Sequence, residues 1–238
     1  MLKNYPKDKY GLYLVSKNNI EEEIEELLKG YNSELLNDPQ AIDIYDFVEN
    51  ELKLNLEFHK ICNDNTVYGL FSFTSGSINV YDNDVDKEIK IKEKTVVIDP
   101  STLDISEHLY RFTLGHEAGH YIFQFNLMNK GFDNLIKTDI NYLNRQNLEF
   151  RNLKRKQLAT KEDWMEWQAN FAASCILMNR SAMLSLISNF LGYEVHYNSH
   201  FLQRMTKSQR TTLVYKISEV FEVSKRAAEI RLIQVSDN

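Results

Sequence analysis

The sequence has few of the features that mark secreted, membrane-spanning or disordered proteins. Its two cysteines, Cys62 and Cys175, form no C-x-x-C pair, so we expect neither a disulfide framework nor a cysteine-based zinc site. It contains only three prolines, no apolar run of membrane-spanning length and no apolar leader after the N-terminus. These absences predict a reduced, globular, cytoplasmic protein with no membrane association.

The negative net charge does not favour binding to a polyanion. The 238 residues carry a formal charge of −6, which gives no overall attraction to nucleic acid or anionic lipid. A hydrophobic content of 43% is enough for a full core, either in one domain with an appendage or in two small domains.

The most informative stretch is the H-E-x-x-H motif formed by His116, Glu117 and His120. Residues four apart lie on the same face of an α-helix, so both imidazoles can reach one cation. Two nitrogen donors suit zinc, and Glu117 can take a proton from a metal-bound water. Gly115 and Gly119 each cost the helix about 1 kcal/mol relative to alanine, which indicates that a strand or a substrate backbone approaches closely here.

The helix that carries this motif is predicted to begin after Ser106 and to run to about Asn126. Leu109, Phe112 and Phe123 share the face of the two histidines. An apolar stripe of this kind faces a protein core, which argues against the alternative of a solvent-exposed helix with two surface histidines.

A second helix offers a third ligand. Thr160 and Asp163 form a capping box that predicts a helix over residues 161–178, apolar nearly all round and therefore buried. Glu166 lies in this helix, and binding a metal would compensate its buried charge. The alternative places Glu166 in an exposed first turn, where the helix dipole favours a carboxylate. Asn170 follows one turn later and is predicted to contact the ligands without binding the ion.

Before the motif, the sequence alternates with the period of β-strands. Residues 67–74 and 78–81 predict one hairpin around the turn at 75–77, and residues 89–92 and 95–98 predict another. We therefore expect an α+β fold in which a small, mostly antiparallel sheet packs on a zinc-binding helix pair, followed by a C-terminal all-helical segment.

The predicted domain boundary follows the second ligand helix. Residues 1–180 would form the metal-site domain and residues 181–238 the C-terminal helical segment. Residues 127–160 form a polar insertion between the ligand helices, where a substrate-facing lid is one interpretation. The last two helices are separated by a short turn capped by Ser224, the order of a helix-turn-helix, so DNA binding stays open. Their basic residues are Lys216, Lys225, Arg226 and Arg231.

The other histidines have simpler interpretations. His59 and His108 lie outside the motif and are expected to be hydrogen-bonded or on the surface. His196 and His200 are also four apart, but they lie in a predicted loop with no acidic residue between them. They form a second metal-site candidate.

Four stretches, at residues 40–44, 111–120, 166–178 and 221–232, together match the pattern of a known family. With these stretches, the sequence resembles the ImmA/IrrE family of metallo-endopeptidases over most of its length. This resemblance implies a gluzincin-like site in which His116, His120 and Glu166 bind zinc and Glu117 is the general base. It also implies a bacterial or phage-related regulator that cuts a partner repressor. Asn179 follows Met178, where the family usually has proline, and the 127–160 segment is longer than usual.

Two functions follow. The first is a zinc-dependent endopeptidase that cuts one specific intracellular protein, a transcriptional repressor. The second is a regulatory protein that binds DNA or a partner and keeps a structural or vestigial metal site. Structural zinc sites normally have four protein ligands, whereas this motif supplies three and retains the base, which favours catalysis. Tyr121 and His196 are open candidates for stabilising the oxyanion.

Overall fold

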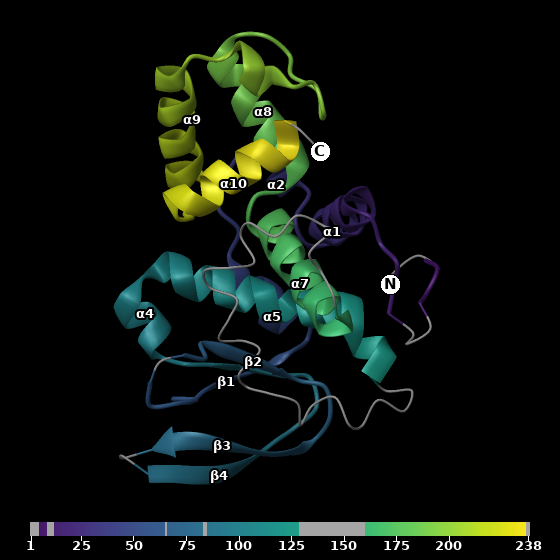
Figure 1. Ribbon diagram of the computed structural model, residues 1–238, viewed down its shortest axis with the longest axis vertical. Helices are drawn as coiled ribbons and strands as arrows, with labels where there is room; N and C mark the ends of the chain where they lie inside the picture. Colours follow the sequence, from purple (N-terminus) through teal and green to yellow (C-terminus); the bar gives the residue numbers. More distant parts are fainter. Residues whose placement is uncertain (1–4, 9–11, 65, 83–84, 129–159, 237–238) are drawn as a thin grey trace.

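The structure is a computed structural model that describes residues 5–8, 12–64, 66–82, 85–128 and 160–236. Two small sheets lie at one end of the molecule and the C-terminal helices at the other, with α5 and α7 between them (Figure 1). The predicted α+β class is therefore confirmed. The elements are α1 (Lys17–Tyr31), α2 (Glu34–Asn37), α3 (Ile44–Asp46), η1 (Phe47–Glu51), β1 (Asn55–Phe58), β2 (Gly69–Ser72), β3 (Gly76–Asp82), β4 (Val85–Ile91), β5 (Thr95–Ile98), α4 (Ser101–Ile105), α5 (Glu107–Met128), α7 (Lys161–Leu177), α8 (Arg180–Leu191), η4 (Phe201–Arg204), α9 (Lys207–Val220) and α10 (Lys225–Ser236).

Strand β5 is the centre of the larger sheet, which has the order β1-β5-β2. It pairs in parallel with β1 and antiparallel with β2, and all four of its residues are buried. Because successive strand residues face opposite sides, Val96 and Ile98 join the main core while Val97 packs in a second cluster with Ile61 and Val67. A strand buried on both faces and paired on both edges anchors the sheet against α5.

The pairing of the strands differs from the sequence-based prediction. Strands β3 and β4 form a separate antiparallel hairpin in which Gly76 lies opposite Ile91, and β2 pairs with β5. The hairpins predicted around residues 75–77 and between 89–92 and 95–98 are therefore wrong. Alternation identifies the two faces of a strand but not its partner. The continuous apolar run of β5 takes the central place and pairs with β2, which leaves β3 to pair with β4.

The C-terminal helices are joined to the rest of the molecule by a buried ion pair. Arg231 in α10 donates from Nη1 and Nη2 to the two carboxylate oxygens of Glu21 in α1, at 2.6 and 2.8 Å. Its Nε donates to the carbonyl oxygen of Met178 at 2.9 Å, and the residue is fully buried. Arg111 in α5 similarly donates from Nε to the carbonyl oxygen of Glu222 at 3.2 Å. The predicted boundary at 180/181 stays a prediction, and these contacts cross it.

Two predictions concern features that the fold tests only in part. Within the described ranges, no single helix is long and apolar enough to cross a membrane. Helices α7 and α8 together have the length and composition of a membrane span, but the pair is bent by 53°. The 127–160 insertion lies almost entirely outside the described residues, so its interpretation as a lid stays a prediction.

Candidate metal centre

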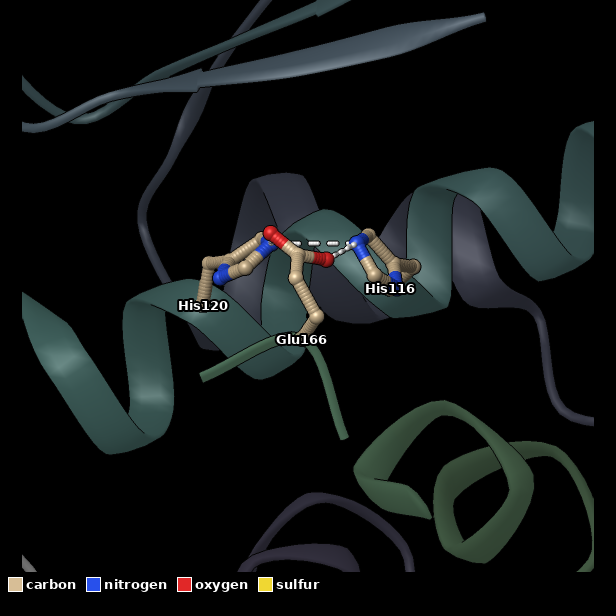
Figure 2. A group of neighbouring side chains, drawn as sticks. All are labelled: His116, His120 and Glu166. Atoms are coloured by element: carbon tan, nitrogen blue, oxygen red, sulfur yellow. Dashed lines mark hydrogen bonds and ion pairs between the residues drawn. The ribbon is translucent and has the colours of Figure 1, made fainter. Parts of the chain in front are cut away.

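Helix α5 places two histidines on one face. The helix starts after Ser106, whose hydroxyl oxygen accepts a hydrogen bond from the backbone N–H of His108 at 3.2 Å. One turn separates His116 from His120, and their Nε2 atoms lie 3.0 Å apart in the interior of the protein. Figure 2 shows both rings directed toward one point, beside the carboxylate of Glu166.

Helix α7 brings the carboxylate to this point. The predicted capping box is confirmed, since the Thr160 hydroxyl accepts from the backbone N–H of Asp163 and the Asp163 side chain accepts from that of Thr160. Glu166 follows in the first two turns and is buried, with 9% of its surface exposed. The alternative of an exposed Glu166 is wrong.

The glycines of the motif allow α5 and α7 to approach each other. A β-carbon on Gly119 would lie 2.8 Å from the carbonyl oxygen of Ala169 and 2.9 Å from its Cα. One on Gly115 would lie 3.5 Å from Ala173. The prediction that these glycines face a strand or a substrate is wrong, because the backbone that approaches them belongs to the other ligand helix. This close contact is what lets Glu166 reach the histidines.

The separations of the three ligand atoms fit a single shared cation. Glu166 Oε2 lies 3.2 Å from His116 Nε2, and Glu166 Oε1 lies 3.4 Å from His120 Nε2. Ligand atoms about 2.0–2.2 Å from a tetrahedral zinc ion are about 3.3–3.6 Å apart, so these two distances and the 3.0 Å between the Nε2 atoms lie within a few tenths of an ångström of that geometry. Although Glu166 Oε2 is near His116, it is buried and receives no hydrogen bond of acceptable geometry. A buried carboxylate oxygen without a donor is costly, and a cation would satisfy it.

The remaining ring nitrogens contact side-chain amides. His116 Nδ1 lies 3.2 Å from Asn170 Oδ1, so Asn170 is where a supporting residue was predicted. His120 Nδ1 lies 2.5 Å from Gln124 Oε1. An amide oxygen only accepts, so each Nδ1 donates, and in the neutral ring the lone pair of Nε2 then faces the shared point. Gln124 was missed from the sequence, although its position four residues after His120, on the same face of the helix, is a visible signal.

The charges of the triad are coupled. Burial alone would raise the pKa of Glu166, but His120 and His116 together, through attraction and hydrogen bonding, outweigh burial and hold that pKa well below its usual range. Burial likewise opposes protonation of His120, yet the Glu166 carboxylate, with smaller contributions from Glu117 and Gln124, raises the pKa of His120 to about 9. An ion that binds His120 must therefore displace the proton from Nε2. Glu166 is therefore ionised and able to serve as a ligand.

Glu117 is buried beside the triad and against the sheet. A β-carbon on Gly69 in β2 would lie 2.9 Å from Glu117 Oε1 and 2.6 Å from Thr113 Cγ2. Burial raises the pKa of Glu117, and attraction to the two histidines opposes this change. A carboxyl group whose pKa is raised above its usual value is suited to proton transfer near neutral pH. Its predicted role as general base is not tested by the geometry.

The other histidines lie apart from this centre. His59 pairs with Glu57 at 3.1 Å, and the ring of His108 donates to the carbonyl oxygen of Glu222 at 3.0 Å. The side chain of His196 is 74% exposed, and His200 has a left-handed backbone with φ of 50°. In the described part of the chain, the one group of three or more His, Cys, Asp or Glu residues close enough to share an ion is that of His116, His120 and Glu166.

Together, the fold and the site define an α+β protein with a buried His–His–Glu candidate metal centre between two helices. No protein-family model matches the sequence, and a search of curated proteins finds no significant match. Any assignment of function therefore rests on the residues of the site and their geometry.

Proposed function

We propose that this protein is a zinc-dependent endopeptidase related to the ImmA/IrrE family. The observation that carries the proposal is the convergence of three ligand atoms, His116 Nε2, His120 Nε2 and a carboxylate oxygen of Glu166 without a hydrogen bond, at one buried point. Two nitrogen donors and one oxygen donor form a ligand set that catalytic zinc sites use, with a further position left for substrate or water.

In this proposal each residue has one task. His116, His120 and Glu166 hold the ion, and Asn170 fixes the ring of His116 from behind. A bound ion would supply polarisation of the scissile carbonyl and would lower the pKa of a water molecule beside Glu117. Glu117 takes the proton from that water and passes it to the leaving amine, a task that its raised pKa favours.

The position of β2 favours an extended peptide as the substrate. In the three-stranded sheet β2 is an edge strand, and its Gly69 lies against Glu117. A peptide can add to such an edge through main-chain hydrogen bonds. A chain paired there would run next to the base, which supports hydrolysis of a peptide bond rather than of a small molecule.

The substrate is proposed to be a specific cytoplasmic regulatory protein, a repressor in the sense of the family resemblance. Substrate binding away from the scissile bond would position that bond and raise turnover. The rival function, DNA binding through the last two helices, is weakened by Arg231. This arginine counted toward their basic character, but its side chain is fully buried against Glu21.

The test compares wild type with Glu117→Gln and with Glu107→Gln, a matched change of an exposed carboxylate on the same helix. Each protein is loaded with zinc, its metal content is measured, and it is incubated with a native lysate of the source cell. New N-termini are then counted by mass spectrometry.

We expect all three proteins to bind zinc, and only Glu117→Gln to lose cleavage, by about 10²–10⁴-fold in rate. Full activity of Glu117→Gln would exclude it as the base. Casein is assayed in parallel with the lysate. If it is digested as fast as any lysate protein, a specific substrate is excluded.

A further inference from the structure

The hydrogen bonds behind His120 continue through two buried glutamines. Gln124 accepts from His120 Nδ1 and donates from Nε2 to the carbonyl oxygen of Met165 at 2.9 Å and to Gln168 Oε1 at 3.3 Å. Gln168 donates from its own Nε2 to the carbonyl oxygen of Tyr13 at 2.8 Å. Both glutamine side chains are buried, so these contacts are made without competition from bulk water.

Backbone carbonyls determine which group donates and which accepts in this series of hydrogen bonds, which runs from His120 through Gln124 and Gln168 to Tyr13. A backbone carbonyl cannot donate, so the amide group facing Met165 O must be the NH₂ of Gln124. Its Oε1 then faces His120, and the ring must donate from Nδ1. The carbonyl of Tyr13 fixes Gln168 in the same way and leaves the Gln168 oxygen for Gln124. Reversing either amide would place two acceptors against each other in a buried site, which is costly.

The direction matters because it decides which nitrogen of His120 is free. With the proton on Nδ1, the lone pair of Nε2 points toward His116 and Glu166, which lie 3.0 and 3.4 Å away. In the other tautomer an N–H would occupy that point and exclude a cation. Met165 also directly precedes Glu166. The hydrogen bond from Gln124 to the carbonyl of Met165 therefore links the ring orientation of His120 to the backbone that carries Glu166.

We infer that Gln124 is a positioning residue of the metal centre, which sets the tautomer and ring orientation of His120, and that the carbonyls of Met165 and Tyr13 set the direction of Gln124. The inference rests on the proposed metal centre and extends it to residues that do not touch the ion. It also gives the segment before α1, through Tyr13 and Gln168, an indirect role in metal binding.

Two substitutions separate positioning from general packing. Gln124→Leu removes the acceptor for His120, whereas Gln124→Glu keeps an acceptor there but loses the donors to Met165 and Gln168. Both variants lose the hydrogen bonds to α7, and Gln124→Glu also places a carboxylate oxygen against the carbonyl of Met165. A merely structural role would therefore weaken zinc binding in Gln124→Glu at least as much as in Gln124→Leu. Asn179→Leu is the control, because it removes a buried amide that bonds Leu35 and Ala182 instead.

The affinity for Zn²⁺ is measured by competition with a chelator, with the melting temperature of each metal-free variant recorded in parallel. Gln124→Leu should bind zinc about 10–100-fold more weakly than wild type, while Gln124→Glu, with a carboxylate behind the imidazole, should stay within about threefold. Asn179→Leu should keep wild-type affinity even if its melting temperature falls. Unchanged affinity in Gln124→Leu, or equal losses in Gln124→Leu and Gln124→Glu, would overturn the inference.

A measurement on wild type decides the matter if Gln124→Leu does not fold. Histidine ¹⁵N labelling of the zinc-loaded protein, which has six histidines, reports by NMR which ring nitrogen carries the proton. We expect the proton of His120 on Nδ1, and a proton on Nε2 would overturn the inference. Wild type that binds no zinc would refute the proposed metal centre itself, whereas zinc binding that is indifferent to Gln124 would refute only the positioning role.

Discussion

The two glycines of the metal-site helix should respond in opposite directions to the same substitution. A β-carbon on Gly115 would meet Ala173 at 3.5 Å, an ordinary van der Waals distance. One on Gly119 would meet the carbonyl oxygen and Cα of Ala169 at 2.8 and 2.9 Å and the β-carbon of Ala172 at 3.1 Å. Two of these three atoms are backbone atoms that cannot rotate away, so α5 and α7 would have to separate.

The expected magnitudes follow from these distances. Alanine in place of glycine inside a helix gains about 1 kcal/mol, and Gly115→Ala should gain about that amount. Gly119→Ala makes the same gain but adds overpacking, which typically costs about 1–3 kcal/mol and should lie at the upper end against backbone. We expect Gly119→Ala to lose about 1–2 kcal/mol net, so the two variants should differ by about 2–3 kcal/mol.

The assay is thermal and urea unfolding of both variants and wild type in the presence of a chelator, so that metal binding does not contribute. A change of 1 kcal/mol should move the melting temperature by about 2–4 °C in a protein of this size. Gly119→Ala should also bind zinc more weakly, because the displacement of α7 in this variant would move Glu166 away from His116 and His120. Equal stability of the two variants would refute the close packing of α5 on α7 as the reason for glycine at 119.

Two further predictions concern the ion pair and the sheet. Arg231→Met should destabilise the protein by about 3–5 kcal/mol because it leaves the Glu21 carboxylate buried without its partner, and the double variant with Glu21→Leu should recover most of that loss in urea unfolding. If the double variant is as unstable as Arg231→Met, the ion pair between Arg231 and Glu21 does not hold α10 against α1. Gly69→Ala should keep zinc but slow cleavage about 10-fold or more by displacing the Glu117 carboxylate, whereas Gly76→Ala, whose β-carbon meets no atom within 4 Å, should match wild type in zinc content and rate.

The helices of the candidate site could be predicted from the sequence because their signals are local. The H-E-x-x-H spacing places His116 and His120 on one face whatever surrounds them. The capping box at Thr160 and Asp163 determines where α7 begins, and the apolar character of that helix predicts a buried Glu166. Each of these inferences needs only residues within a few turns of one another.

What could not be predicted depends on contacts between distant segments. The partners of β2 and β3 follow from which strand takes the centre of the sheet, and alternation does not encode that choice. Arg231 had the sequence appearance of a surface cation, yet it pairs with a glutamate 210 residues away. Gln168 was missed for the same reason, since its partners Gln124 and Tyr13 lie on other segments of the chain, whereas Gln124 lies one turn from His120 and had a local signal.

The most direct test of the metal centre is zinc binding by wild type and by two matched variants of α7, with content measured by elemental analysis and affinity by chelator competition. Glu166→Gln removes the carboxylate that lies 3.2 Å from His116 Nε2, and Glu162→Gln removes one a turn earlier that pairs with Lys161. We predict one zinc ion per chain in wild type and in Glu162→Gln, and much weaker binding in Glu166→Gln. Wild type without zinc, or Glu166→Gln with unchanged stoichiometry and affinity, would contradict the proposed metal centre.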